Sequence, residues 1–208
     1  MSNLITQSKR SVVDVSDRVM SNRMREWYHL YPNIHDKGLD WYRDAYEFTH
    51  RIAKKYEVTP YTVAVVLSRL SPNNKWDRNK IDCESVIIAY LLGKHPDDVK
   101  VCTYNANKIK AFQAMEGIDI EESSPKTHAF AMNIAHMSPD HVTIDRWHLR
   151  ACVTRPREGV VKCVDSCTNI QYKRVERVTS KLAKNLGIKG YELQAIIWLS
   201  IKKSWNRV

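Results

Sequence analysis

One stretch of the chain, TPYTVAVVLSRLSP at residues 59–72, constrains the fold more than any other. Thr59 is a favoured helix N-cap, and Pro60 suits the first position of a helix. The interior from Val63 to Leu70 is almost wholly apolar, which predicts a buried helix at the centre of a lobe. Its β-branched residues are also compatible with a strand. We prefer the helix because of the cap and because the neighbouring segments have helical periodicity.

Apolar residues recur at helical spacing through most of the chain. The 208 residues include only 6 glycines and 7 prolines, fewer turn residues than a β-rich chain of this length needs. We therefore predict an all-α fold. The other predicted helices are residues 16–30, 39–56, 76–92, 104–116 (capped by Thr103), 125–136 (capped by Ser124), 146–154 (capped by Asp145), 170–186 and 191–204, with a loop over 154–169.

The formal net charge is +10 and the sequence pI is about 9.4. Such an excess attracts polyanions, of which nucleic acid is the commonest, although charge alone does not identify a partner. Basic pairs such as Lys173/Arg174, Lys181/Lys184 and Lys202/Lys203 are typical of solvated helix faces. Some of them should contact phosphate if the protein acts on DNA.

The five cysteines favour an intracellular, reducing compartment, because their number is odd and the first residues lack the apolar region of a secretory signal. Cys163 and Cys167 have a C-x3-C spacing that is not usual for zinc. No stretch is long enough for a membrane span. We expect no metal, no cofactor and no membrane contact.

Two charged residues stand at predicted helix starts. Lys126 lies just inside the helix that begins SPKTHAF, where the helix dipole favours the neutral amine that attacks as a nucleophile. On the local sequence alone, a solvated surface lysine is the more ordinary interpretation. Asp145 follows the apolar residues VTI, and helix capping is a sufficient structural reason for it.

Taken together, PKTHAF and VTID resemble the helix-hairpin-helix DNA glycosylase superfamily, the group of endonuclease III and 8-oxoguanine DNA glycosylase. Members carry a lysine at a helix start after the hairpin, and an aspartate 18 or 19 residues later after an apolar run. Lys126 and Asp145 are 19 positions apart. Arg150 matches an arginine that recurs five residues after the aspartate in the endonuclease III branch.

Two more stretches carry the resemblance, which covers residues 60–155 or so, about half of the chain. VVLSRLSPNNKWDRN (65–79) is similar to a segment that reaches DNA at the lesion, and YNANKIKAF (104–112) is similar to the helix before the hairpin. Asparagine amides donate and accept hydrogen bonds at once, which suits contact with an orphaned or flipped base. The positions matched to DNA contact are Ser71, Asn73, Asn74 and Asn79.

The hairpin itself departs from the family pattern. The stretch IDIEESSPKT has no glycine after Gly117, whereas the family hairpin has glycines that let backbone N–H groups approach a phosphate. It also carries three carboxylates, at Asp119, Glu121 and Glu122. The cysteines do not match the iron–sulfur loop of endonuclease III, so the resemblance implies no cluster.

The resemblance implies a two-lobed helical glycosylase fold with the active site in the cleft between the lobes. One lobe would span about 57–155, the other about 12–56 plus 165–208, in a single domain of 1–208. It implies a monomeric base-excision-repair enzyme, a bifunctional DNA glycosylase and AP lyase that acts on double-stranded DNA. Lys126 would attack C1′ of a flipped nucleotide and Asp145 would stabilise the transition state.

The SPNN run and the 19-residue spacing favour oxidised purines, 8-oxoguanine especially, as the excised base. Trp147 stands where a histidine is frequent in the family. Candidates for the base pocket and DNA contacts are His128, Phe130, Trp147, His148, Arg150, Tyr191, Gln194 and Trp198.

Two other functions stay open from the residues. Glycosylase-like enzymes of the same superfamily are associated with bacteriophage DNA hypermodification, in which a small molecule is joined to a base. A non-catalytic all-α nucleic-acid-binding protein would use Lys126 as a surface charge and Asp145 only as a cap.

Overall fold

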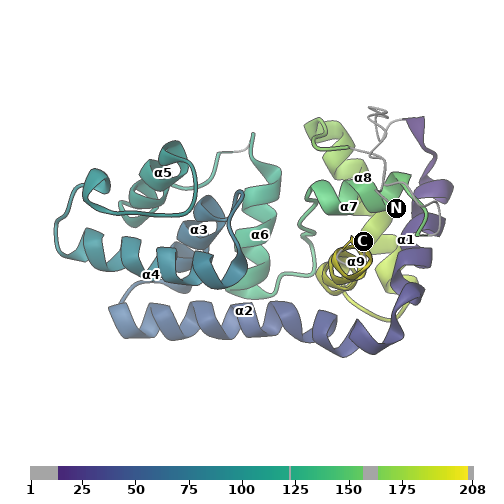
Figure 1. The fold of residues 1–208 in the computed structure, drawn as a ribbon, viewed down its shortest axis with the longest axis horizontal. Helices are drawn as coiled ribbons and strands as arrows, with labels where there is room; N and C mark the ends of the chain where they lie inside the picture. Colours follow the sequence, from purple (N-terminus) through teal and green to yellow (C-terminus); the bar gives the residue numbers. More distant parts are fainter. Residues whose placement is uncertain (1–13, 122, 157–163, 206–208) are drawn as a thin grey trace. The chain divides into compact units, whose positions relative to one another are not determined.

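The computed structural model describes residues 14–121, 123–156 and 164–205. Helices dominate this part of the chain and it contains no strand, which confirms the all-α prediction. None of the helices described is both long enough and apolar enough to cross a membrane. In chain order the helices are α1 (Asp17–Leu30), α2 (His35–Tyr56), α3 (Pro60–Leu70), α4 (Trp76–Leu91), α5 (Asn105–Met115), α6 (Pro125–His136), α7 (Arg146–Val153), α8 (Asn169–Asn185) and α9 (Gly190–Trp205), with short 3-10 helices at Pro32–Ile34 and Pro96–Asp98 (Figure 1).

Most helix limits follow from local signals. The hydroxyl of Thr59 accepts the backbone N–H of Thr62 at 3.0 Å, so the predicted cap of α3 is confirmed. The prediction that Thr103 caps α5 is wrong, because Tyr104 is at the N-cap position and the Thr103 hydroxyl donates to the carbonyl of Pro72 at 2.9 Å. Thr103 thus secures the loop after α3, and its hydroxyl also accepts the side-chain amide of Asn107, in the first turn of α5, at 3.2 Å.

The chain forms two compact units. Unit 1 comprises Met1–Tyr42 and Pro139–Val208, and unit 2 comprises Arg43–Ser138, so α2 contributes to both. These limits differ from the predicted lobes in two stretches. Residues 43–56 belong to unit 2, where the ring of Phe48 lies 6.4 Å from that of Trp76 on α4. Residues 139–155 belong to unit 1, because α7 packs on α1 and α9.

Unit 2 is built around α3, which packs against α4, α5 and α6. Every residue from Val63 to Leu70 is buried, as the apolar run predicts. Ile87 from α4 and Ile134 from α6 complete this core, and both are fully buried. The centre of unit 2 is therefore the helix that the sequence marks most clearly.

Unit 1 brings the two ends of the chain together, because α1 packs against α7, α8 and α9. The indole N–H of Trp27 on α1 donates to the carbonyl of Thr154 at 2.9 Å, across 127 positions of sequence. At the start of α2, a Cβ added to Gly38 would lie 2.3 Å from Cγ1 of Ile196 on α9. Gly38 thus permits a close approach of α2 to α9 that a larger residue would prevent.

Candidate functional site

Lys126 is the second residue of α6, in unit 2, and its side chain is half-buried. Ser124 is at the N-cap position, as predicted, but its side chain does not bond to a backbone N–H of the first turn. Lys126 therefore lies among the backbone N–H groups at the positive end of the α6 dipole. This is the position at which the sequence places a candidate nucleophile.

The segment before Lys126 is tied to α3 and α5 through its carboxylates. The Tyr61 hydroxyl donates to Asp119 Oδ1 at 2.7 Å. Glu121 forms ion pairs with Lys110 at 2.9 Å and Arg69 at 2.6 Å, and the bonds from these two cations lower the pKa of Glu121 to about 2. Asp119 and Glu121 thus act as structural links within unit 2. These contacts differ from those of the usual phosphate-binding hairpin, which offers free backbone N–H groups to a phosphate.

Asp145 lies in unit 1 and caps α7, because its Oδ1 accepts the backbone N–H of His148 at 2.8 Å. The predicted cap is confirmed. The apolar residues before it are anchored to α8: the Tyr172 hydroxyl donates to the carbonyl of Val142 at 2.7 Å and accepts the N–H of Ile144 at 3.1 Å. The Asp145 carboxylate is thus half-buried and held at the N-terminus of α7.

A buried tyrosine–glutamine pair lies near Asp145. The Tyr42 hydroxyl, from α2, donates to Oε1 of Gln194 on α9 at 2.9 Å. Burial raises the pKa of Tyr42, a hydrogen bond with Thr143 lowers it, and the charge of Asp145 raises it again. Together these effects raise the pKa of Tyr42, so its hydroxyl keeps its proton and donates it in the hydrogen bond to the Gln194 carbonyl oxygen. The amide N–H groups of Gln194 are then directed away from Tyr42 and are suited to an acceptor.

A tryptophan cluster, which we define as Trp41, Trp147 and Trp198, lies beside one cation of α9, Lys202. Lys202 Nζ lies 4.7 Å from the ring centre of Trp147 and 5.6 Å from that of Trp198. Trp41 and Trp198 have their ring centres 6.3 Å apart. All three tryptophans are half-buried. Half-buried aromatic rings beside a cation are typical of surfaces on which nucleic-acid bases stack.

Arg150 adds a second cation to this region and is predicted to contact DNA. Its guanidinium carbon lies 4.8 Å from the ring centre of Trp147, and its Nη2 donates to Asp165 Oδ1. The predicted residues Trp147, Arg150 and Trp198 are therefore close together in unit 1, where Gln194 also lies near Asp145.

The three predicted asparagines of unit 2 have different environments. Asn73 is exposed, has a φ of 57°, and donates through its amide to the Tyr104 hydroxyl. Asn74 donates to Asp82 Oδ2 at 2.9 Å. Asn79 is buried and donates to the carbonyl of Leu67 at 3.0 Å, which secures the end of α3. Its burial gives Asn79 a structural role in place of the expected DNA contact.

The predicted histidines also differ. His128 is half-buried on α6, two residues after Lys126. His148 is buried in unit 1, where its Nε2 lies 2.9 Å from the Thr179 hydroxyl. Burial lowers the pKa of His148 to about 4, so it is neutral near pH 7. We therefore assign His148 to the core and not to the DNA surface.

Sequence reasoning missed the partners that come from distant helices, namely Tyr42, Thr143 and Trp41, and it gave Lys202 no individual role. Tyr42 and Gln194 are 152 positions apart, and no local pattern relates them. In the part of the chain that the structure describes, no group of three or more His, Cys, Asp or Glu side chains is placed to hold a metal ion.

Comparison with known proteins gives one result. No curated protein and no solved structure matches the chain. A family model matches residues 2–205, almost the whole chain. The chain therefore belongs to the DUF7178 family, a family of unknown function.

Proposed function

We propose that the protein is a DNA N-glycosylase with AP lyase activity, which excises a damaged or modified base from double-stranded DNA. The observation that carries the proposal is the matching position of two residues. Lys126 is in the first turn of α6 and Asp145 caps α7, with only α6 and a short anchored segment between them in sequence. This is the order and spacing that the glycosylase superfamily requires of its lysine and aspartate.

The two-unit organisation supports the same proposal. Unit 2 is one continuous segment, while unit 1 combines both ends of the chain. In the proposal these units are the two lobes of a glycosylase. Lys126 and Asp145 act on the same nucleotide. That nucleotide must be flipped out, because its C1′ is out of reach while the base is stacked in the duplex.

The chemistry divides into excision and strand cleavage. The neutral amine of Lys126 forms a bond to C1′ as the C1′–N bond to the base breaks, and the base leaves with the electron pair and takes up a proton. Asp145 stabilises the positive charge that develops on the sugar and accepts a proton from the amine. Opening of the sugar ring gives a Schiff base, loss of a C2′ proton breaks the C3′–O3′ bond, and water then releases the lysine.

Base recognition in this proposal falls to unit 1. Gln194 presents its amide N–H groups because Tyr42 holds its carbonyl oxygen, and the tryptophan cluster with Lys202 offers stacking surfaces and positive charge. Asn73 and Asn74 remain candidates for contact with DNA at the lesion. The enzyme acts as a monomer inside the cell, and we favour oxidised purines, 8-oxoguanine first, as substrates.

Borohydride trapping on duplexes that contain one intact modified base tests the proposal. An intact lesion is essential, because any exposed lysine can form a Schiff base with a ready-made abasic site. The wild-type protein is expected to give a covalent adduct with the 8-oxoguanine duplex and none with an undamaged duplex. The adduct is lost in Lys126→Ala and kept in Lys100→Ala, which removes an exposed lysine of the same unit.

A panel of oxidised, alkylated and deaminated bases extends the test beyond 8-oxoguanine. Adducts with a different lesion would change the substrate and keep the mechanism. If the wild type gives no adduct with any duplex that contains an intact modified base, and behaves as Lys126→Ala does, the glycosylase/lyase proposal is rejected.

A further inference from the structure

The positive charge of the chain is concentrated in one unit. Unit 1 contains 20 Lys and Arg against 11 Asp and Glu, whereas unit 2 contains 13 against 12. The formal charge of +10 is therefore +9 on unit 1 and +1 on unit 2. A sign asymmetry of this size points to a polyanion that contacts unit 1.

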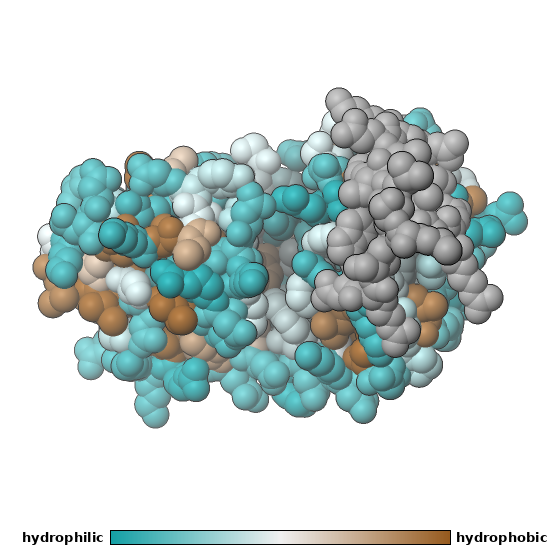
Figure 2. Space-filling model, in the orientation of Figure 1, coloured by the Kyte–Doolittle hydropathy of each residue, from teal (hydrophilic) through white to brown (hydrophobic). Residues whose placement is uncertain are grey.

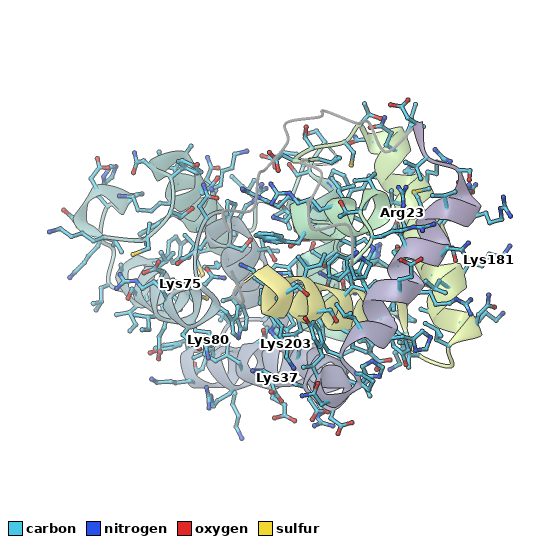
Figure 3. The ribbon with its side chains drawn as sticks, turned by 45° about the vertical axis from the view of Figure 1, so that its right-hand side comes forward. Arg23, Lys37, Lys75, Lys80, Lys181 and Lys203 are labelled. Atoms are coloured by element: carbon cyan, nitrogen blue, oxygen red, sulfur yellow. The ribbon has the colours of Figure 1, made fainter. Side chains whose placement is uncertain are left out.

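Within unit 1, α8 carries four exposed cations on one face, which we call the α8 stripe: Lys173, Arg177, Lys181 and Lys184. Their spacing of four, four and three residues keeps them on one side of the helix, over a length of about 16 Å at about 1.5 Å per residue. Figure 3 shows Lys181 extending outward from unit 1. A row of this kind is long enough to follow several successive phosphates of one strand.

Two acidic groups lie near the stripe, and neither is paired with its lysines. Glu176, on the same helix, accepts the backbone N–H of Val142 at 2.9 Å. Asp17 accepts from Arg174 at 2.7 Å and from Arg177 at 3.1 Å. Among the described residues, no carboxylate forms an ion pair with any lysine of the stripe. Its three lysines are therefore solvated cations, available to a phosphate.

We infer that the α8 stripe is a docking surface for the phosphate backbone of duplex DNA. The choice of duplex DNA as the polyanion rests on the proposed function, while the surface itself rests on the charges. The stripe supplies the sequence-independent anchoring that the segment before Lys126 does not provide, since Asp119 and Glu121 there bind groups of unit 2. Binding releases counterions from the DNA, so its affinity must fall steeply with salt.

The test is the salt dependence of binding to an undamaged duplex, which requires no lysine chemistry. A stripe variant, Lys173→Gln with Lys181→Gln and Lys184→Gln, keeps Arg177 and its bond to Asp17. A plot of log affinity against log salt is expected to become shallower by about 2 to 3, because each phosphate that a lysine neutralises adds about 0.9 to the slope. Circular dichroism and thermal unfolding check that the variant keeps its fold.

The matched control removes three exposed lysines from unit 2, through Lys54→Gln, Lys94→Gln and Lys100→Gln, and so makes the same change in net charge. Its slope is expected to stay within about 1 of the wild type. Equal slopes for the stripe and control variants would overturn the inference, as would a stripe variant that weakens binding only to duplex RNA.

The inference and the proposed function fail separately. Lys126→Ala is expected to keep the wild-type salt slope while it loses the borohydride adduct. If the stripe variant has a shallower slope but the wild type never forms an adduct, the docking surface is supported and the glycosylase proposal is rejected.

Discussion

The two units differ in net charge and in the number of hydrophobic side chains that they expose. Unit 1 carries nearly all of the net charge, and of its described residues only Ile170 is a large, exposed hydrophobic side chain. Unit 2 is almost neutral, and its described residues include seven such side chains. They are Ile81, Ile88, Leu91, Leu92, Tyr104, Ile109 and Ile118. Figure 2 shows brown patches over the region of α4 and α5.

This difference separates two parts of the proposed activity. In the proposal, the docking surface, base recognition and Asp145 fall to unit 1, while the candidate nucleophile, Lys126, belongs to a unit with a charge of only +1. Binding and chemistry should therefore be separable by mutation. A chain with an evenly spread charge would not allow this separation.

The largest effect is expected at Asp145, where charge and capping can be tested apart. Asparagine caps a helix about as well as aspartate, so Asp145→Asn keeps unit 1 folded and removes only the negative charge. We expect single-turnover base excision to fall by about 100- to 1000-fold, as for other losses of transition-state electrostatics. Asp145→Ala should also lower the free energy of unfolding by about 1 kcal/mol. Excision at the wild-type rate in Asp145→Asn would remove Asp145 from the mechanism.

Core substitutions test whether the units are independent. Leu67 on α3 and Leu193 on α9 are both fully buried, in unit 2 and unit 1 respectively. Replacing either with Ala should lower the free energy of unfolding by about 2–5 kcal/mol. Hydrogen-exchange mass spectrometry is expected to show faster exchange mainly in the unit that carries the substitution. Equal acceleration in both units would mean that they unfold together and that the comparison applies only to their surfaces.

Acid should weaken unit 1 before unit 2. The pKa of His148 is about 4 in the folded protein, whereas an unperturbed histidine, as in the unfolded chain, has a pKa of 6.5. As the pH falls, the unfolded chain therefore binds the proton first. Unit 1 should then lose stability between pH 6.5 and pH 4, by about 3 kcal/mol in total. Denaturant unfolding at a series of pH values measures this loss, and His148→Gln should flatten the profile in that range. An unchanged profile in this variant would contradict the assignment.

Unit 2 should lose stability at a lower pH than unit 1, because of Glu121. Because Lys110 and Arg69 lower its pKa from 4.5 to about 2, the stabilisation by Glu121 is complete above pH 4.5 and is lost as the pH falls toward 2. Glu121→Gln should remove this dependence without changing the profile above pH 5. The same denaturant series measures it, and a loss that begins above pH 5 would point to another group.

The smallest effect is expected at the tyrosine–glutamine pair. Tyr42→Phe removes the hydrogen bonds of the Tyr42 hydroxyl with Gln194 and Thr143 and leaves Gln194 Oε1 without this donor, which should cost unit 1 about 1–3 kcal/mol. The rate of excision of a damaged base should fall, because Tyr42 no longer holds the Gln194 amide in one orientation. The affinity for undamaged DNA should change little. Unchanged discrimination between damaged and undamaged duplexes would show that Gln194 does not recognise the base.

The sequence predicted the helices well because their limits depend on nearby residues. Thr59 with Pro60 and Asp145 with its apolar run act within one helical turn, so their effects are visible in sequence. The error at Thr103 has the opposite cause. Its hydroxyl found a partner 31 positions away at Pro72, and that contact is invisible to a local pattern.

The candidate site was predictable only in part. Lys126 and Asp145 were found through motif spacing, whereas their surroundings depend on packing. Asn79 and His148 were matched to DNA contact by their place in the sequence, yet both are buried and bonded within their own unit. A polar side chain is equally polar in the core and on the surface, so sequence alone does not distinguish the two environments.

By itself, the sequence determined the all-α class, the buried centre at α3 and the total charge of +10, because composition, periodicity and capping are properties of short stretches. Only the tertiary structure decided which residues share a unit. It joined α1 to α8 and α9, set Tyr42 against Gln194, and placed nearly all the net charge on unit 1. The physical reason is that burial and packing act between helices far apart in the chain, where no local pattern records the pairing.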